Sequence, residues 1–293
     1  MQSTIIEAPL PLTDLEPSII GPPYIVNIDN QAQVSIKGST IKGIECTDCD
    51  ELFGITVLSD ATLKLDSAAI KDCTSVGVIV GSLRIPTGAQ TGHATITNTI
   101  ITDYRANGIV VPGSGSTLTI SHSKIIGDAP DAFGIIGISF HTGAKAKIVN
   151  NIISENKCKI PNTCGPNPIT QVQAIGILAD SAGKGSVISN NYVSNNDAGI
   201  VVFGTSGCCI IDHNKLTDNH FFGIVIADGE HTISNTKIFG GKVGVLAIAF
   251  SVNTVATLDH VKIIDAKIPV QALSSEGFTA TVNVVSPISL HPD

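Results

Sequence analysis

Acidic side chains recur at one position in a series of short β-branched segments of this chain, and they are the first candidates for chemistry. They form a predicted column, which contains Asp72, Asp103, Asp128, Glu155, Asp218 and Asp265. If successive segments stack about 5 Å apart, these like charges repel each other unless a cation lies between them. Asp103, Asp128 and Glu155 offer the oxygen ligands that Ca²⁺ prefers, and Arg105 stands beside them as a group that draws a proton. The alternative is that they are ordinary acidic residues at solvent-facing turns.

Cysteines form the second group of chemically interesting residues, and the chain contains seven of them. Cys158 and Cys164 lie in the longest predicted insert, residues 157–172, where a disulfide would pin the loop; free thiols are the other possibility. Cys46 and Cys49 have CxxC spacing, but no second cysteine pair or histidine cluster completes a tetrahedral zinc site. The odd total leaves at least one thiol unpaired, buried or shared with another chain.

The elements that must position these residues repeat along the sequence. The clearest copies span residues 187–202, 210–226 and 232–247, and the glycine that opens the last strand of each copy is Gly199, Gly223 or Gly244. These glycines are 24 and then 21 residues apart. Each copy contains three β-branched segments separated by corners, so each copy predicts one three-sided coil of a solenoid.

Two kinds of corner recur through the whole chain. Glycine opens a strand at Gly54, Gly77, Gly108, Gly137, Gly176, Gly199, Gly223 and Gly244, with Pro269 at a ninth such position. The other corner residues are Gly38, Ser67, Asn98, His122, Asn150, Asn190, His213, Asn235 and His260. Asparagine tolerates a left-handed backbone, and its amide can bond to the equivalent side chain of the next coil. We therefore expect a ladder at these corners, in which the histidines replace asparagine.

This pattern resembles the right-handed parallel β-helix family, which includes pectate lyases, polygalacturonases and periplasmic copper-site maturation proteins. The resemblance implies an all-β, single-stranded solenoid of about nine three-strand coils. We predict that it occupies residues 24–293, after an extended proline-rich arm at residues 1–23. The polygalacturonase active-site pattern is missing. The Asp-His pair at His213 falls on a corner position of the repeat, where histidine replaces asparagine. The resemblance therefore predicts the fold but not an activity.

The strand after each opening glycine predicts an aliphatic outer face. Alternation points its outward residues away from the core, and six of them are Ile79, Val110, Leu178, Val201, Val225 and Leu246. Enzymes of this fold keep their acids and bases on that face, and aliphatic side chains supply neither. An apolar stripe of this length needs a cover. The cover is the arm at residues 1–23 or the same face of another subunit, and the second option predicts a homo-oligomer, with a trimer favoured.

Composition narrows the remaining choices. A net charge of −8 and only two arginines, Arg84 and Arg105, argue against a nucleic-acid partner. No apolar run is long enough to span a membrane, and the first residues show no classical signal peptide. Our leading hypothesis is a non-catalytic, rigid β-helical protein of a cell, spore or virion surface, which self-assembles or binds glycans and needs no cofactor. The alternatives are a polysaccharide lyase or glycoside hydrolase that uses Asp103, Arg105, Asp128 and Glu155, with or without Ca²⁺, and a biosynthetic enzyme with an apolar pocket.

Overall fold

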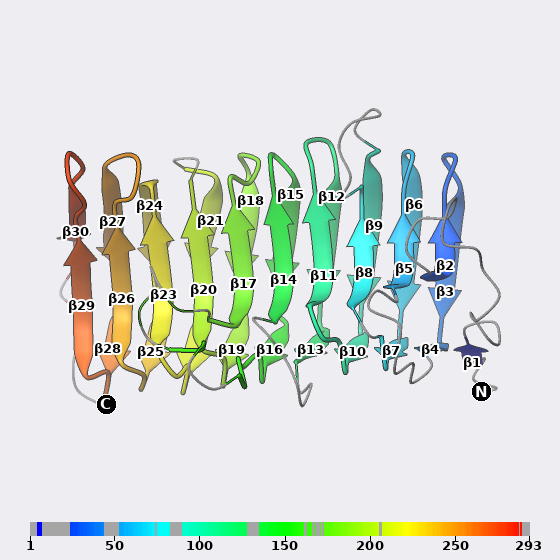
Figure 1. Cartoon of the computed structure of the whole chain (residues 1–293), viewed down its shortest axis with the longest axis horizontal. Coiled ribbons are helices and arrows are strands. Elements are labelled where there is room, and N and C mark those ends of the chain that lie inside the picture. Colours follow the sequence, from blue (N-terminus) through cyan, green and yellow to red (C-terminus); the bar gives the residue numbers. More distant parts are fainter. Residues whose placement is uncertain are drawn as a thin grey trace.

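The computed structural model shows a long parallel β-solenoid (Figure 1). It describes residues 5–7, 24–43, 53–73, 75–82, 90–127, 135–160, 163–165, 167, 171, 173–204, 207–286 and 288. Within these residues the regular secondary structure consists of β-strands, arranged as three ten-stranded sheets around about nine turns. The all-β fold and the predicted number of coils are therefore confirmed.

The chain visits the three sheets, here named A, B and C, in an unchanging order. Sheet A contains β1 (Ile5–Glu7), β4 (Thr40–Lys42), β7 (Ala69–Lys71), β10 (Ile100–Thr102), β13 (Lys124–Ile126), β16 (Ile152–Ser154), β19 (Tyr192–Ser194), β22 (Lys215–Thr217), β25 (Lys237–Phe239) and β28 (Lys262–Ile264). Sheet B contains β2 (Tyr24–Ile28), β5 (Phe53–Val57), β8 (Val76–Val80), β11 (Asn107–Pro112), β14 (Ile136–His141), β17 (Ile175–Asp180), β20 (Ala198–Phe203), β23 (Phe222–Ala227), β26 (Val243–Ile248) and β29 (Ile268–Leu273). Sheet C contains β3 (Gln33–Lys37), β6 (Ala61–Asp66), β9 (Gly92–Thr97), β12 (Thr117–Ser121), β15 (Lys145–Val149), β18 (Ser186–Ser189), β21 (Cys209–Asp212), β24 (Gly229–Ser234), β27 (Thr254–Asp259) and β30 (Ala280–Val284).

In-register parallel pairing stacks equivalent side chains into columns. In sheet A, Val193 pairs with Leu216 and Leu216 pairs with Ile238, and all three are buried. One apolar cluster of this kind follows the interior along the solenoid. Small β-branched and aliphatic residues fill this narrow interior well, which explains why so few aromatic residues are needed.

The strand-opening glycines are required because the coils approach closely there. A Cβ on Gly199 would lie 2.6 Å from the carbonyl oxygen of Gly223 in the next coil, which no side chain tolerates. The same relation holds along the column, through Gly244, whose Cβ would lie 2.6 Å from the carbonyl oxygen of Pro269. A Cβ would therefore be in the way at this bend.

The other corners have the expected backbone but a different ladder. All nine predicted corner residues have positive φ, between 47° and 62°. The stacked, buried side chains lie one residue later, at Thr99, Ser123, Asn151, Asn191, Asn214 and Thr236. Asn191 Oδ1, for example, accepts a hydrogen bond from the Asn151 backbone N–H, with an N···O distance of 3.0 Å. The expectation of a ladder at the corner residue itself was wrong, because the residue that follows the left-handed bend is the one that points inward.

The proline-rich arm was expected to precede the solenoid, yet part of it belongs to the solenoid. β1 lies within residues 1–23 and pairs in parallel with β4, with Ile5 opposite Thr40. The rest of the arm lies outside the described residues. In the described part of the chain, no helix is long and apolar enough to cross a membrane.

Candidate functional site

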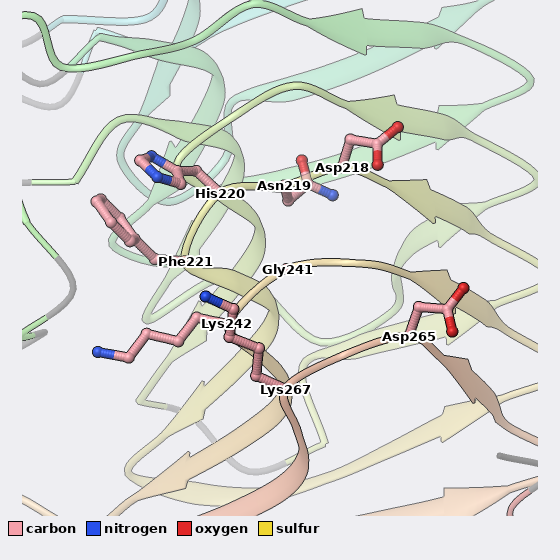
Figure 2. Close-up of a pocket in the computed structure, with 8 residues that line it drawn as sticks. All are labelled: Asp218, Asn219, His220, Phe221, Gly241, Lys242, Asp265 and Lys267. Carbon is pink, nitrogen blue, oxygen red and sulfur yellow. The ribbon is translucent and has the colours of Figure 1, made fainter.

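A pocket of about 410 Å³ opens where the chain passes from sheet A to sheet B near the C-terminal end of the solenoid. Three successive passages line it: the first connects β22 to β23, the second β25 to β26 and the third β28 to β29. The lining residues are Asp218, Asn219, His220, Phe221, Gly241, Lys242, Asp265 and Lys267 (Figure 2). Because each passage leaves a strand of a regular sheet, the pocket groups are carried by a rigid framework.

The pocket exists because its middle passage begins with two glycines. Gly240 and Gly241 have φ of 71° and 88°, a left-handed conformation that side-chain-bearing residues rarely adopt. A Cβ on Gly241 would lie 2.6 Å from the Asn219 carbonyl oxygen, so this passage packs directly against the one before it. The two glycines bring no side chain to the hollow, and they leave room between the first and third passages.

Charged side chains occupy two ends of the pocket. Asp218 and Asp265 hold the same position in their coils, with Gly240 between them, which separates them by two coil spacings, or roughly 10 Å. Lys242 and Lys267 come from the second and third passages, and both are exposed. In Figure 2 the lysine side chains extend on the side of the His220 and Phe221 rings, whereas the two carboxylates lie at the other end.

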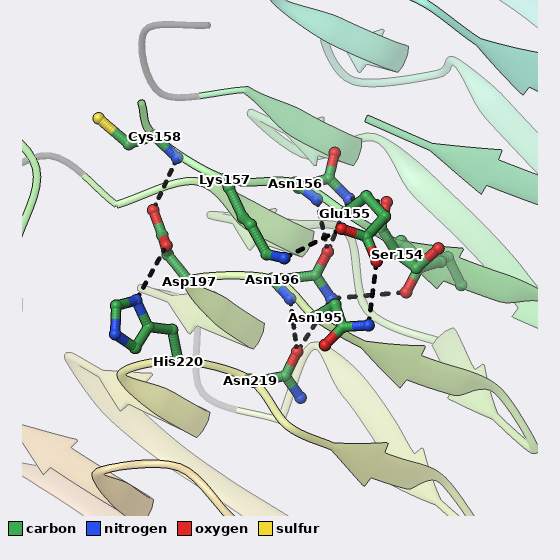
Figure 3. Close-up of polar contacts among 11 residues, drawn as sticks. Ser154, Glu155, Asn156, Lys157, Cys158, Asn195, Asn196, Asp197, Asn219 and His220 are labelled. Atoms are coloured by element: carbon green, nitrogen blue, oxygen red, sulfur yellow. Dashed lines mark hydrogen bonds and ion pairs between the residues drawn. The ribbon is translucent and has the colours of Figure 1, made fainter. Parts of the chain in front are cut away.

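Two stacked rings border the pocket. The His220 and Phe221 rings have centroids 4.2 Å apart and an interplanar angle of 21°. The His220 side chain is exposed, and its Nδ1 lies 3.8 Å from Oδ1 of Asp197 (Figure 3). This pair places an imidazole at the rim of the pocket with a carboxylate behind it.

Asp197 is the buried centre of this corner. It is 2% exposed, and its Oδ2 accepts hydrogen bonds from the backbone N–H groups of Cys158 at 2.9 Å and Ala174 at 3.0 Å. Burial raises the pKa of Asp197, and the two backbone hydrogen bonds oppose that shift. Cys158 lies near the start of the long insert and Ala174 just after its end, so one carboxylate ties both ends of the insert to the solenoid. A disulfide between Cys158 and Cys164, with Cα atoms 5.6 Å apart, closes a loop inside the insert.

Two of the three predicted calcium ligands, Asp103 and Glu155, lie in the described part of the chain, in coils that are not adjacent. In sheet A, Thr102 pairs with Ile126 and Ile126 pairs with Ser154, so the column after these strands reads Asp103, Gly127, Glu155. Gly127 therefore holds the position that we had expected for Asp128, and Asp128 itself lies outside the described residues. Asp103 and Glu155 are two coil spacings apart, roughly 10 Å.

The contacts of these carboxylates are local. Glu155 accepts hydrogen bonds from Lys157 Nζ at 3.0 Å and from Asn195 Nδ2 at 2.9 Å (Figure 3), and Asp103 accepts one from the Thr102 hydroxyl at 2.7 Å. Arg105 is exposed. Among the described residues no group of three His, Cys, Asp or Glu side chains could hold a metal ion. The catalytic and Ca²⁺-binding roles of this set stay predictions.

The aliphatic outer face points outward but is already covered. Ile79 and Val110 belong to one apolar cluster and Val225 and Leu246 to another, and both clusters are separate from the core. These four side chains are at most 5% exposed in the single chain, and Leu178 and Val201 are half-buried. The face therefore presents little bare apolar surface to a second subunit.

The sequence analysis did not single out the ring pair, the two lysines or Asp197. The signal lay in the differences between copies, since His220 and Phe221 stand where the copy before has only Asp197, between Asn196 and Ala198. Gly240 and Gly241 break the same stretch in the next copy. The disulfide between the adjacent residues Cys208 and Cys209 was also missed. Cys73 is a buried free thiol, and burial with the nearby Asp72 charge raises its pKa to about 12.

Comparisons with known proteins agree with this architecture. The family model for a right-handed beta helix region matches residues 24–136 and 89–257. The chain therefore belongs to the right-handed β-helix family. A comparison with curated protein sequences gives no significant match.

Three solved structures show the range of similar proteins. The Dettilon tailspike protein is 13% identical with a TM-score of 0.42, over 89% of this chain and 61% of its own. An α-1,3-glucanase from Streptomyces thermodiastaticus is 14% identical with a TM-score of 0.33, over 92% of this chain and 64% of its own. The surface protein and adhesin PfbA of Streptococcus pneumoniae is 10% identical with a TM-score of 0.34, over 92% of this chain and 91% of its own. The chain thus spans less than two thirds of the first two proteins.

Proposed function

We propose that this chain is a rigid β-helical surface protein that binds a glycan in the corner pocket without catalysis. The observation that carries the proposal is a pocket that is lined in part by Gly241 and bordered by the stacked rings of His220 and Phe221. An aromatic ring offers a flat apolar surface to the C–H face of a sugar, while the surrounding charged groups can bond to its hydroxyls.

The framework of the pocket supports a binding role. Its groups come from three consecutive passages between in-register sheets, so their spacing is fixed before a ligand arrives. Preorganisation of this kind raises affinity because little conformational freedom is lost on binding. Six of the eight lining residues have polar or charged side chains, which does not favour the alternative of an apolar substrate pocket.

A surface or extracellular location belongs to the same proposal. Two disulfides, Cys158–Cys164 and Cys208–Cys209, support it because disulfides persist mainly in oxidising environments. Self-assembly, with a trimer favoured, is the second part of the proposal. The exposed apolar side chains of Phe203, Ile210 and Val252 support it, since the predicted outer face is largely covered. Light scattering tests this part, and a strictly monomeric mass over a wide concentration range contradicts it.

The experiment for glycan binding uses a panel of neutral and acidic oligosaccharides and isothermal titration calorimetry. Phe221→Ala removes the stacking surface and should weaken binding about tenfold, a loss of roughly 1.4 kcal/mol. Tyr24→Ala is the matched control, because Tyr24 is an aromatic residue 38% exposed on sheet B and does not line the pocket. Folded wild-type protein that binds no glycan would overturn the proposal. Turnover of an acidic polysaccharide, with or without Ca²⁺, would support the lyase or hydrolase alternative instead.

A further inference from the structure

We infer that the pocket selects a sugar that carries an anionic group, which Lys242 and Lys267 hold together. This inference rests on the proposed glycan binding and adds the chemical class of the ligand. Its starting point is the arrangement of charges around the pocket.

The two lysines lie in consecutive coils at the same passage. The backbone N–H of Ile268 donates to the Lys242 carbonyl at 2.9 Å, and that of Lys267 donates to the Gly241 carbonyl at 3.2 Å. Their backbones are therefore about one coil spacing, roughly 5 Å, apart. Two ammonium groups carried on such neighbouring backbones repel each other, and an anion that both of them contact would remove this repulsion.

Two other lysines near this corner already have partners. Lys157 Nζ lies 3.0 Å from Glu155 Oε2, and Lys215 Nζ lies 5.4 Å from the centroid of the Tyr192 ring. Within the described part of the chain, Lys242 and Lys267 have no such ion pair or ring contact. The carboxylates of Asp218 and Asp265 lie at the other end of the pocket (Figure 2), so the lysines remain available to a ligand.

The ring pair adds an imidazole on the lysine side. Because His220 Nδ1 faces the Asp197 carboxylate, Nε2 is the ring nitrogen left for a ligand. Asp197 is a positioning residue here, since its Oδ2 is occupied by the Cys158 and Ala174 backbone N–H groups. A carboxylate, sulfate or phosphate ester of a sugar would thus meet the two lysine ammonium donors at this end, beside the imidazole.

The opposite end fixes the orientation of the sugar. Asp218 and Asp265 can accept hydrogen bonds from hydroxyls, but they repel a second anionic group. Gly240 stands between them in the stack of coils and brings no side chain. The pocket therefore suits a sugar unit with one anionic group next to the lysines and neutral hydroxyls next to the carboxylates.

The test uses three oligosaccharides that differ only at C6 of one unit. This carbon is part of a hydroxymethyl group, of a carboxylate or of a sulfated hydroxymethyl group. Calorimetry at low salt should show that wild-type protein binds the two acidic probes about tenfold more tightly than the neutral one. The double variant Lys242→Gln, Lys267→Gln should lose this preference and still bind the neutral probe. Added salt should weaken wild-type binding to the acidic probes much more than binding to the neutral probe.

Lys237→Gln is the matched control, because Lys237 is an exposed lysine of β25, stacked between Lys215 and Lys262, and does not line the pocket. It should keep the wild-type preference. A preference that survives in the double variant, or equal binding of all three probes by wild-type protein, would overturn the inference and leave glycan binding intact. If none of the three probes and no other glycan binds, both proposals fall. The difference between the carboxylate and sulfate probes identifies which anion the pocket takes.

Discussion

The carboxylate of Asp212, the last residue of β21, accepts a hydrogen bond from the hydroxyl of Ser234 in the next coil at 2.7 Å. The same oxygen accepts the Asn235 amide at 2.9 Å. An equivalent pair of hydrogen bonds occurs at Asp66, whose carboxylate accepts from Thr97 and Asn98 at 3.0 Å each. An aspartate at the end of a sheet C strand therefore ties one corner to the next wherever the repeat supplies it.

Asp212→Asn should reduce the loss of stability in acid. Partial burial tends to raise the pKa of Asp212, but hydrogen bonds from Asn235, Ser234 and His213 outweigh it, so the pKa is lowered. A carboxyl whose pKa is lower in the folded than in the unfolded state stabilises the fold above its unfolded value, about 3.9, and loses that contribution as the pH falls through the lowered value. Urea unfolding of both proteins from about pH 6 to about pH 2 measures the difference. Free energies of unfolding that fall equally with decreasing pH in the two proteins would contradict this prediction.

Asp197→Asn should change the pH dependence in the opposite direction. Because burial raises the pKa of Asp197, its charged form costs stability above the raised value, and the cost disappears as the pH falls below the unfolded value of about 3.9. Wild-type protein should therefore gain stability relative to the variant between neutral pH and about pH 4. The amide oxygen of asparagine can still accept from Cys158 and Ala174, so the variant is expected to fold. A stability difference that does not change over this interval would exclude the effect.

Asn191→Ala should destabilise the protein by on the order of 3 kcal/mol, because it leaves several buried partners unsatisfied. The Asn191 amide donates to Asn214 Oδ1 at 3.1 Å and to the Ile148 carbonyl at 2.9 Å, and its oxygen accepts from the Asn151 backbone. The neighbouring Asn190→Gly variant is the control. Asn190 has φ of 57° and an exposed side chain, so glycine there should change the stability by about 0.5 kcal/mol at most. Equal midpoints of urea unfolding for the two variants would count against the ladder.

Gly199→Ala should be more damaging than Gly185→Ala. A Cβ at Gly199 meets the Gly223 carbonyl oxygen, which is backbone and cannot move aside. At Gly185 an added Cβ would have nothing within 4 Å, so alanine there bears only the cost of a positive φ, about 1 kcal/mol. Thermal unfolding and soluble yield compare the two variants. Similar values for both would show that the coils can separate at the glycine column.

Removing the disulfide with Cys158→Ser, Cys164→Ser should expose the insert to protease without unfolding the solenoid. The bond joins two residues that are six positions apart and closes a loop that contains Lys159. Its loss should therefore speed tryptic cleavage at Lys159. Mass spectrometry of the fragments locates the cut, and circular dichroism checks that the sheets remain. Unchanged cleavage kinetics would mean that Asp197 alone holds the insert in place.

The fold was predictable because the repeat is visible in residue types. Glycine at the close approach and asparagine or histidine at the left-handed corner are both dictated by local backbone geometry, and both positions are confirmed. The ladder was displaced by one residue because Asn190 and Asn191 are both asparagine, and residue type alone does not say which of two identical neighbours points inward. Asp128 was assigned to the acidic column by residue type, but Gly127 holds that position in the register, and Asp128 itself lies outside the described residues.

The pocket was harder to predict because it results from missing side chains. Gly240 and Gly241 read as one more turn in the sequence, and their effect on the neighbouring Asp218 and Asp265 passages appears only when the coils are stacked. Lys242 and Lys267 are 25 residues apart in sequence and are brought together by the coil register alone. The aliphatic face shows the same limit, since the sequence predicts that Val225 and Leu246 point outward but not that the chain covers them.

The strands in each sheet follow the order of the chain, so every backbone hydrogen bond between coils lies along the long axis of the molecule (Figure 1). Tension applied between the first and last coils is therefore carried in series by the hydrogen bonds between each coil and the next. The link between β21 and β24 has two paired positions, Ile211 with Ile233 and Asp212 with Ser234, whereas β24 and β27 share six. Under a stretching force the molecule should begin to part in sheet C at that link, just before the coil that supplies Gly240 and Gly241.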